Sequence, residues 1–220
     1  RHLHVPKVMI DIIEKLGPKL SVEGTFRISG NATRLKGIFK ELDAGKRVED
    51  TVDEVHDLTG TLKALLRQLP IPLLTCELYQ PFIDAVKLPD QRSRLLALQL
   101  LVLCLPKEHI DTFALLSALW NLTAVTDGNK MSASTLASII SPNILRPLPT
   151  NKKRPRDVQQ AIASELMNHG AACKIVEIFI VNHNAIGVIP ARATKLAGTW
   201  LLTSFHPDPF GLSTSTCNSP

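Results

Sequence analysis

The residue best suited to chemistry is Arg27, which lies in the short stretch EGTFRISGN at residues 23–31. Glycines near both ends of this stretch mark turns, and the apolar residues Phe26 and Ile28 flank the arginine. A guanidinium is planar and permanently charged, so it binds carboxylates and phosphates through paired hydrogen bonds. Arg27 is therefore a candidate anion-binding residue, and the ordinary alternative is a solvated side chain that pairs with Glu23.

A second cationic feature is the pair Lys63 and Arg67, which are four residues apart and share one face of a helix. His56 and Gly60 continue this face toward the start of the helix, and a stripe of leucines occupies the opposite face. One interpretation is a solvated outer surface, which is common for such pairs. The other is a surface that binds an anion or a carboxylate.

Asn143 is a third candidate, because it follows Ser141-Pro142 at the end of an apolar run. Its amide is suited either to capping the chain or to reaching a partner. Patterns typical of self-contained enzymes are missing: the sequence has no GxSxG, HExxH, Walker or GxGxxG motif, and its seven histidines lack metal-ligand spacing. We expect neither a hydrolase active site nor a metal site.

The composition is that of a globular protein with a substantial core. The chain has 220 residues, of which 45% are hydrophobic and 20% charged, and this fits one large domain. Its four cysteines follow no metal-ligand or redox spacing, which predicts a reducing compartment. The richest apolar run, 95–105, is too short to cross a bilayer, and the first residues do not resemble a signal peptide. We expect a soluble, cytoplasmic protein.

The net charge of +5 raises the question of anionic partners. Basic and acidic residues are interleaved except in NKKRPR at 151–156. This segment has three interpretations: a solvated loop, a weak contact with anionic lipids that recruits the protein to a membrane, or a nuclear signal. One tyrosine and two tryptophans offer few surfaces for base stacking, so no nucleic-acid partner is expected.

The periodicity of the apolar residues is helical almost throughout, and no run of period two competes. The fold class is therefore all-α, a single-domain bundle of about eight or nine helices. The expected helices span 5–16, 31–45, 53–69, 75–86, 90–105, 107–125, 132–142, 157–168 and 171–183. Because 90–105 is apolar almost all round, we expect it to be enclosed.

The last part of the chain has a different composition. From about residue 190 the periodicity is lost among prolines, serines and threonines. The expected organisation is a helical domain at 1–189 and a largely disordered tail at 190–220.

Three blocks of the sequence, taken together, resemble a known family. They are EGTFRISGNATRLKGIFKELDAG, DLTGTLKALLRQLPIPLLT and NKMSASTLASIISPNILRP. In this order and spacing they are similar to the RhoGAP domain, the GTPase-activating domain for Rho-family small GTPases, and the resemblance extends over about residues 3–189. It implies the RhoGAP helical fold.

The resemblance also implies roles for single residues. Arg27 matches the arginine finger that the family inserts into a partner GTPase, and Phe26 and Ile28 are expected to pack into the bundle and hold it in place. The residues implied to face the partner GTPase are Lys63, Arg67, Asn143, Asn129 and Lys130.

The implied function is stimulation of GTP hydrolysis by Rho, Rac or Cdc42-type GTPases in the GTP-bound state. Such a protein is not itself an enzyme and needs no cofactor of its own, because the partner carries GTP and Mg²⁺. The alternative is a RhoGAP-fold module that binds a GTPase or another signalling protein without accelerating hydrolysis. Gln68 and Ile71 stand where the family usually has acids, and Ser141 where it has glycine, which bears on efficiency and GTPase preference.

Overall fold

The computed structural model describes residues 4–147 and 155–188, with side chains in the second range from residue 166 onward. This part of the chain forms nine α-helices, two short 3₁₀ turns and no strand, which confirms the all-α prediction for the described residues. The helices are α1 (Lys7–Leu16), α2 (Ala32–Asp43), α3 (Val48–Thr51), α4 (Val55–Gln68), α5 (Tyr79–Ala85), α6 (Gln91–Leu103), α7 (Lys107–Val125), α8 (Ala133–Ile144) and α9 (Pro155–Val181). The 3₁₀ turns are η1 (Gly17–Lys19) and η2 (His183–Ala185).

Several helix starts follow the capping residues that the sequence indicates. The side-chain oxygen of Asn31 accepts the N–H groups of Thr33 and Arg34 at the start of α2. Asp90 and Ser132 cap α6 and α8 in the same way. These bonds satisfy N–H groups that have no partner within the helix, and so they set where each helix begins.

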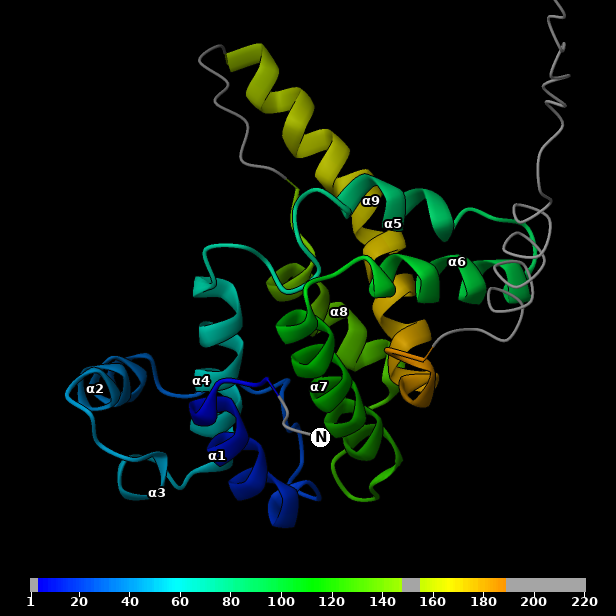
Figure 1. Cartoon of the computed structure of the whole chain (residues 1–220). Helices are drawn as coiled ribbons and strands as arrows, with labels where there is room; N and C mark the ends of the chain where they lie inside the picture. The colour runs from blue at the N-terminus through cyan, green and yellow to red at the C-terminus, as the bar shows by residue number, and fades with distance from the viewer. Residues whose placement is uncertain (1–3, 148–154, 189–220) are drawn as a thin grey trace, which may run out of the picture. The chain divides into compact units, whose positions relative to one another are not determined.

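Helix α4 is the element that connects the parts of the domain. It contacts α1 and α2 on one side and α8 on another, and Figure 1 shows it standing between these helices. Its apolar residues Leu58, Leu62 and Leu66 are completely buried in the common core. Side chains on α4 are therefore held by packing on several sides, which suits an element that positions a site.

Two expected helices form one. Helix α9 runs unbroken from Pro155 to Val181 through Gly170, where the sequence predicted a break between 168 and 171. A single glycine inside a helix costs only about 1 kcal/mol, and Ile175, Val176 and Phe179 bury the second half of α9 in the core. The first turns of α9 extend beyond the neighbouring helices in Figure 1.

The prediction that Pro142 ends its helix is also wrong. Helix α8 continues through this proline to Ile144. Proline removes one backbone N–H from the turn, and the side-chain amide of Asn143 donates to the Ile139 carbonyl of the same turn at 2.8 Å. Asn143 therefore lies within the last turn of α8.

Helix α6 is less enclosed than expected. Only Leu98 and Val102 are buried on it, and Leu100 is 41% exposed. The enclosed helix is α7, whose Phe113, Leu116 and Trp120 are fully buried between neighbours that include α8 and α9. All-round apolar character does not specify how many neighbours a helix has, so it could not distinguish these two. None of the helices in the described parts of the chain combines the length and apolarity that a bilayer crossing requires.

Candidate functional site

Residues 21–30 form a tight loop between η1 and α2, with Arg27 exposed on it; it is here called the finger loop after the role that the family resemblance implies for Arg27. The backbone N–H groups of Arg27 and Ile28 both donate to the Gly24 carbonyl at 2.8 Å. The Arg27 side chain is 49% exposed, and its Nη2 lies 4.0 Å from a carboxylate oxygen of Glu23. At this distance and exposure the ion pair contributes little, so Arg27 can engage a partner anion.

Phe26 anchors the finger loop from the inside. Its side chain is completely buried, and its φ of 69° lies in the left-handed region that bulky residues rarely adopt. This conformation costs free energy that packing and hydrogen bonding must offset. Ile28 was expected to pack inward as well, but it is 44% exposed and lies over Gly24, where an added Cβ would come within 2.6 Å of it. Phe26 therefore anchors the loop, whereas Ile28 lies on the surface.

Lys63 on α4 holds the Phe26 backbone. Its Nζ donates to the Phe26 carbonyl at 2.6 Å, across 37 residues of sequence. Burial, and secondarily the charge of Arg67, lower the pKa of Lys63 below its ordinary value. A half-buried ammonium that donates to the residue before Arg27 is a brace for the loop.

The rest of the α4 face differs from the sequence prediction. Gly60 is buried, and an added Cβ there would lie 3.2 Å from Leu35 of α2. His56 is partly buried, and α2 packs against α4. The predicted cationic face is therefore reduced to Lys63 and Arg67.

Arg67 and Asn143 lie together where α4 meets α8. The Arg67 Nε donates to the Asn143 Oδ1 at 3.2 Å, and Asn143 is only 5% exposed. Asn143 donates to a carbonyl of its own helix through Nδ2, which corresponds to the capping alternative, and accepts from Arg67 through Oδ1; contact with a partner stays a prediction. Arg67 is exposed, and its guanidinium is oriented by this bond.

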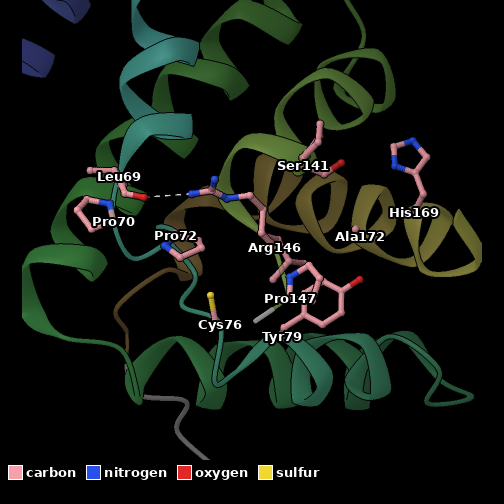
Figure 2. A pocket seen from close by; sticks show the side chains of 12 residues that line it. Leu69, Pro70, Pro72, Cys76, Tyr79, Ser141, Arg146, Pro147, His169 and Ala172 are labelled. Atoms are coloured by element: carbon pink, nitrogen blue, oxygen red, sulfur yellow. Dashed lines mark hydrogen bonds between the residues drawn. The ribbon is translucent and has the colours of Figure 1, made fainter. Parts of the chain in front are cut away.

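Arg146 was not predicted as a site residue, yet it fixes the end of α4. Its Nη1 donates to the Arg67 carbonyl at 2.9 Å and its Nη2 to the Leu69 carbonyl at 3.2 Å, the bond drawn in Figure 2. The last carbonyls of a helix lack partners within the helix, and a cation there also complements the helix dipole. Arg146 is thereby a bridge that holds Arg67 beside Asn143.

Asn129 and Lys130 lie in the turn between α7 and α8, next to the finger loop. The Lys130 Nζ is 2.9 Å from a Glu23 carboxylate oxygen, and this ammonium holds the pKa of that carboxyl below its usual range. Asn129 does not lie on the surface as predicted: it is 1% exposed, and its own carbonyl accepts the Gly24 N–H at 2.8 Å. A residue buried beneath the loop can act on a partner only through the loop.

Asp57 is a second residue that the sequence prediction missed. Its buried carboxylate accepts the Asn31 N–H at 2.9 Å and pairs with the guanidinium of Arg34. Gly30 lies directly against it, and a Cβ at Gly30 would come within 2.5 Å of the Asp57 Oδ1. The far end of the finger loop is therefore attached to α4, as Phe26 is through Lys63.

A cavity of about 450 Å³ opens beside the junction of α4 and α8 (Figure 2). Pro70, Pro72 and Cys76 line it on the side that follows α4, and Ser141 and His169 line it from α8 and α9. Burial raises the pKa of the Cys76 thiol, which makes this cysteine a poor nucleophile. Within the described residues, no three His, Cys, Asp or Glu side chains come together as metal ligands would.

The comparison with known families accounts for this arrangement. The RhoGAP domain matches residues 5–149, which hold the finger loop, α4 and α8. The chain belongs to the RhoGAP domain family. The three sequence blocks predicted this membership, and it is confirmed.

Named relatives share this domain. Rho GTPase-activating protein gacN of Dictyostelium discoideum is 37% identical over 133 residues, 58% of this chain and 21% of that protein. Rho GTPase-activating protein 6 of Mus musculus is 32% identical over 214 residues, 90% of this chain and 20% of that protein. The chain thus spans about a fifth of the length of these relatives.

Solved structures share the fold. The BH domain of GRAF, the GTPase regulator associated with focal adhesion kinase, superposes with a TM-score of 0.70 at 25% identity, covering 84% of this chain and 98% of that one. Human Rho GTPase activating protein 15 superposes with a TM-score of 0.71 at 24% identity, over 84% of this RhoGAP chain and 85% of that one. The helical architecture is therefore that of the RhoGAP domain.

Proposed function

We propose that this RhoGAP domain stimulates GTP hydrolysis by a Rho, Rac or Cdc42-type small GTPase in its GTP-bound state. The partner supplies GTP, Mg²⁺ and the attacking water, and Arg27 enters the partner's active site as an arginine finger. The observation that carries the proposal is the contrast between Arg27 and its neighbour: the Arg27 side chain is 49% exposed while Phe26 is completely buried. An exposed cation on a backbone anchored at the adjacent residue has the form that insertion in trans requires.

The chemistry follows from charge development during phosphoryl transfer. Negative charge accumulates on the γ-phosphate oxygens and the β–γ bridging oxygen, and a guanidinium placed there stabilises the transition state more than the ground state. Fingers of this kind increase turnover about 10³- to 10⁵-fold, or about 4 to 7 kcal/mol of barrier. A loop that is already anchored leaves less ordering cost to be met on docking.

The neighbouring polar residues support docking. We propose that the Arg67 guanidinium, oriented by Asn143, binds carboxylates in the switch regions of the partner. Lys63 adds positive charge one helical turn away while it braces the Phe26 carbonyl. Asn143 is mostly buried, so its contribution to a partner is confined to the edge that its 5% exposure leaves accessible.

The test is single-turnover GTP hydrolysis by Rho, Rac, Cdc42 and Ras proteins with the wild-type chain, Arg27→Ala and Arg27→Lys. We expect at least one Rho-family GTPase to be accelerated by orders of magnitude and both variants to bind it without comparable acceleration. Arg47→Ala, at an exposed arginine that pairs with Glu49 in α3, is the matched control and should behave as wild type. Saturable binding with unchanged hydrolysis across the panel would instead identify a non-catalytic binding module.

Location and membrane contact are separate proposals. We propose that the domain is cytoplasmic and that residues 151–156 make weak contact with anionic lipid. The side chains of this segment lie outside the described residues, and so does the predicted tail at 190–220. Binding to vesicles that contain anionic lipid should weaken strongly with salt and disappear when Lys152, Lys153, Arg154 and Arg156 are neutralised. Salt-independent binding would contradict this proposal.

A further inference from the structure

Both polar atoms of the Asn129 side chain form hydrogen bonds within the domain. Its Nδ2 donates to the Leu20 carbonyl at 2.8 Å and to the Thr123 carbonyl at 2.7 Å. Its Oδ1 accepts the Met131 N–H at 2.8 Å. These three bonds tie the end of η1, the end of α7 and the start of α8 to one buried amide.

The main chain around Asn129 supports the finger loop. The Asn129 carbonyl accepts the Gly24 N–H at 2.8 Å, and the Gly24 carbonyl in turn accepts the N–H groups of Arg27 and Ile28. The preceding residue, Gly128, has a φ of 91°, and a Cβ there would lie 3.1 Å from the Ser21 carbonyl. Only two backbone hydrogen bonds in series therefore separate Asn129 from Arg27.

We propose that Asn129 is a positioning residue for the finger: its buried amide fixes the turn between α7 and α8, and this turn fixes Gly24 and hence Arg27. The proposal rests on the proposed function of Arg27. It differs from direct contact with the partner, because a residue that is 1% exposed cannot form an interface. Lys63 holds the loop at Phe26 from α4, and Asn129 holds it at Gly24 from the α7–α8 turn, so the loop is fixed on both sides of Thr25.

The principal variant is Asn129→Ala, which removes all three side-chain bonds. Gly128→Ala is the second variant, because it leaves the buried amide intact and displaces the same turn from Ser21 through a Cβ at a positive φ. Asn121→Ala is the matched control: this asparagine lies on α7, and its Nδ2 donates to the Ile180 carbonyl of α9 at 3.0 Å. It removes an asparagine-to-carbonyl bond of the same kind, made to α9 instead of to the segments that support the finger loop.

The measurement separates the saturating rate of stimulated GTP hydrolysis from affinity for the GTPase loaded with a non-hydrolysable GTP analogue. We expect Asn129→Ala and Gly128→Ala to lower the saturating rate about tenfold or more, while affinity stays within about threefold of wild type. Asn121→Ala should lower thermal stability with the rate unchanged. In an Arg27→Ala background, Asn129→Ala should add no further loss of rate, since a residue that acts through the finger has nothing left to position.

Three results would overturn the inference. The first is a wild-type rate in a folded Asn129→Ala or Gly128→Ala protein, and the second is a loss that multiplies with that of Arg27→Ala. The third is a loss confined to affinity, which would return Asn129 to docking. If Arg27→Ala itself retains full stimulation, the proposed function fails and the inference falls with it, a result distinct from the other three. Should Asn129→Ala fail to fold, Gly128→Ala decides.

Discussion

Replacing Lys63 by methionine separates loop bracing from stability. Methionine keeps an unbranched apolar stem of similar length, so the packing around α4 changes little. What disappears is the Nζ that donates to the Phe26 carbonyl at 2.6 Å. Phe26 is completely buried and itself has a φ of 69°, so the carbonyl of a strained residue would be left without this donor.

The magnitude follows from these two features. Leaving a buried backbone acceptor unsatisfied costs about 1–3 kcal/mol, and a left-handed conformation at a bulky residue costs a similar amount. If the loop loses about 2 kcal/mol relative to relaxed conformations, the equilibrium ratio of loops that present Arg27 to relaxed loops falls about thirtyfold. Global stability should change far less, because burial lowers the pKa of Lys63, which means that the folded protein disfavours the charge that methionine removes.

We therefore expect Lys63→Met to lower the saturating rate of stimulated GTP hydrolysis, by up to about thirtyfold, while its melting temperature stays within a few degrees of wild type. Single-turnover hydrolysis at saturating domain and thermal denaturation measure the two quantities. Lys174→Met, at an exposed lysine of α9 paired with Glu177, is the control and should change neither. A wild-type rate in Lys63→Met would refute the bracing role, and a rate that falls only in step with unfolding would reduce Lys63 to a residue of general stability.

Three further predictions concern Lys63, Gly30 and Arg146. The pKa of Lys63 in the folded protein lies below its ordinary 10.5, so as pH rises toward 10.5 the folded protein loses this proton before the unfolded chain does. The unfolding free energy of wild type, minus that of Lys63→Met, should therefore increase with pH below 10.5. Denaturant titrations at several pH values measure this difference, and a difference that does not change with pH would contradict the prediction. Gly30→Ala puts a Cβ 2.5 Å from Asp57 Oδ1, so it should lower the free energy of unfolding by about 1–3 kcal/mol in denaturant titrations and also lower the stimulated rate of GTP hydrolysis. Gly37→Ala is the control: there is open space around its Cβ, and it should lower neither quantity. Arg146→Met removes the bonds to the carbonyls of Arg67 and Leu69 at the end of α4. It should lower the melting temperature by about 4–8 °C and weaken GTPase affinity more than the saturating rate, and equal losses of affinity and rate would argue against this role.

Local chemistry made much of the fold predictable. Asn31, Asp90 and Ser132 cap helices as their types suggest, because the interaction lies within four residues of sequence. Pro142 and Gly170 misled for the opposite reason: helix breakers are weak against tertiary packing, and α8 and α9 are held by their extensive contact with each other.

The candidate site was predictable in residue type but not in geometry. Arg27 and the pair Lys63 and Arg67 stand out from their own neighbours in sequence. The bond from Lys63 to Phe26 and the one from Asn129 to Gly24 join segments 37 and 105 positions apart, and no local pattern encodes such pairings. The family resemblance implies that Asn129 faces the partner GTPase, whereas its buried amide is an internal brace, as is common for turn residues with an amide side chain.

The attachments of the finger loop also explain why Arg27 itself is left weakly bonded. Side chains of α4 and a backbone carbonyl of the α7–α8 turn form hydrogen bonds with the main chain of Gly24, Phe26 and Asn31. Among the described residues, the Arg27 guanidinium pairs with Glu23 alone, at 4.0 Å. Glu23 is more closely engaged by Lys130, at 2.9 Å, which reduces its attraction for Arg27. If Glu23 bound Arg27 tightly, insertion into a partner would first have to break that pair. An anchored backbone combined with a weakly held side chain lowers both the ordering cost and the release cost of docking, which is what the proposed role of Arg27 as a finger requires and what a structural arginine such as Arg146 lacks.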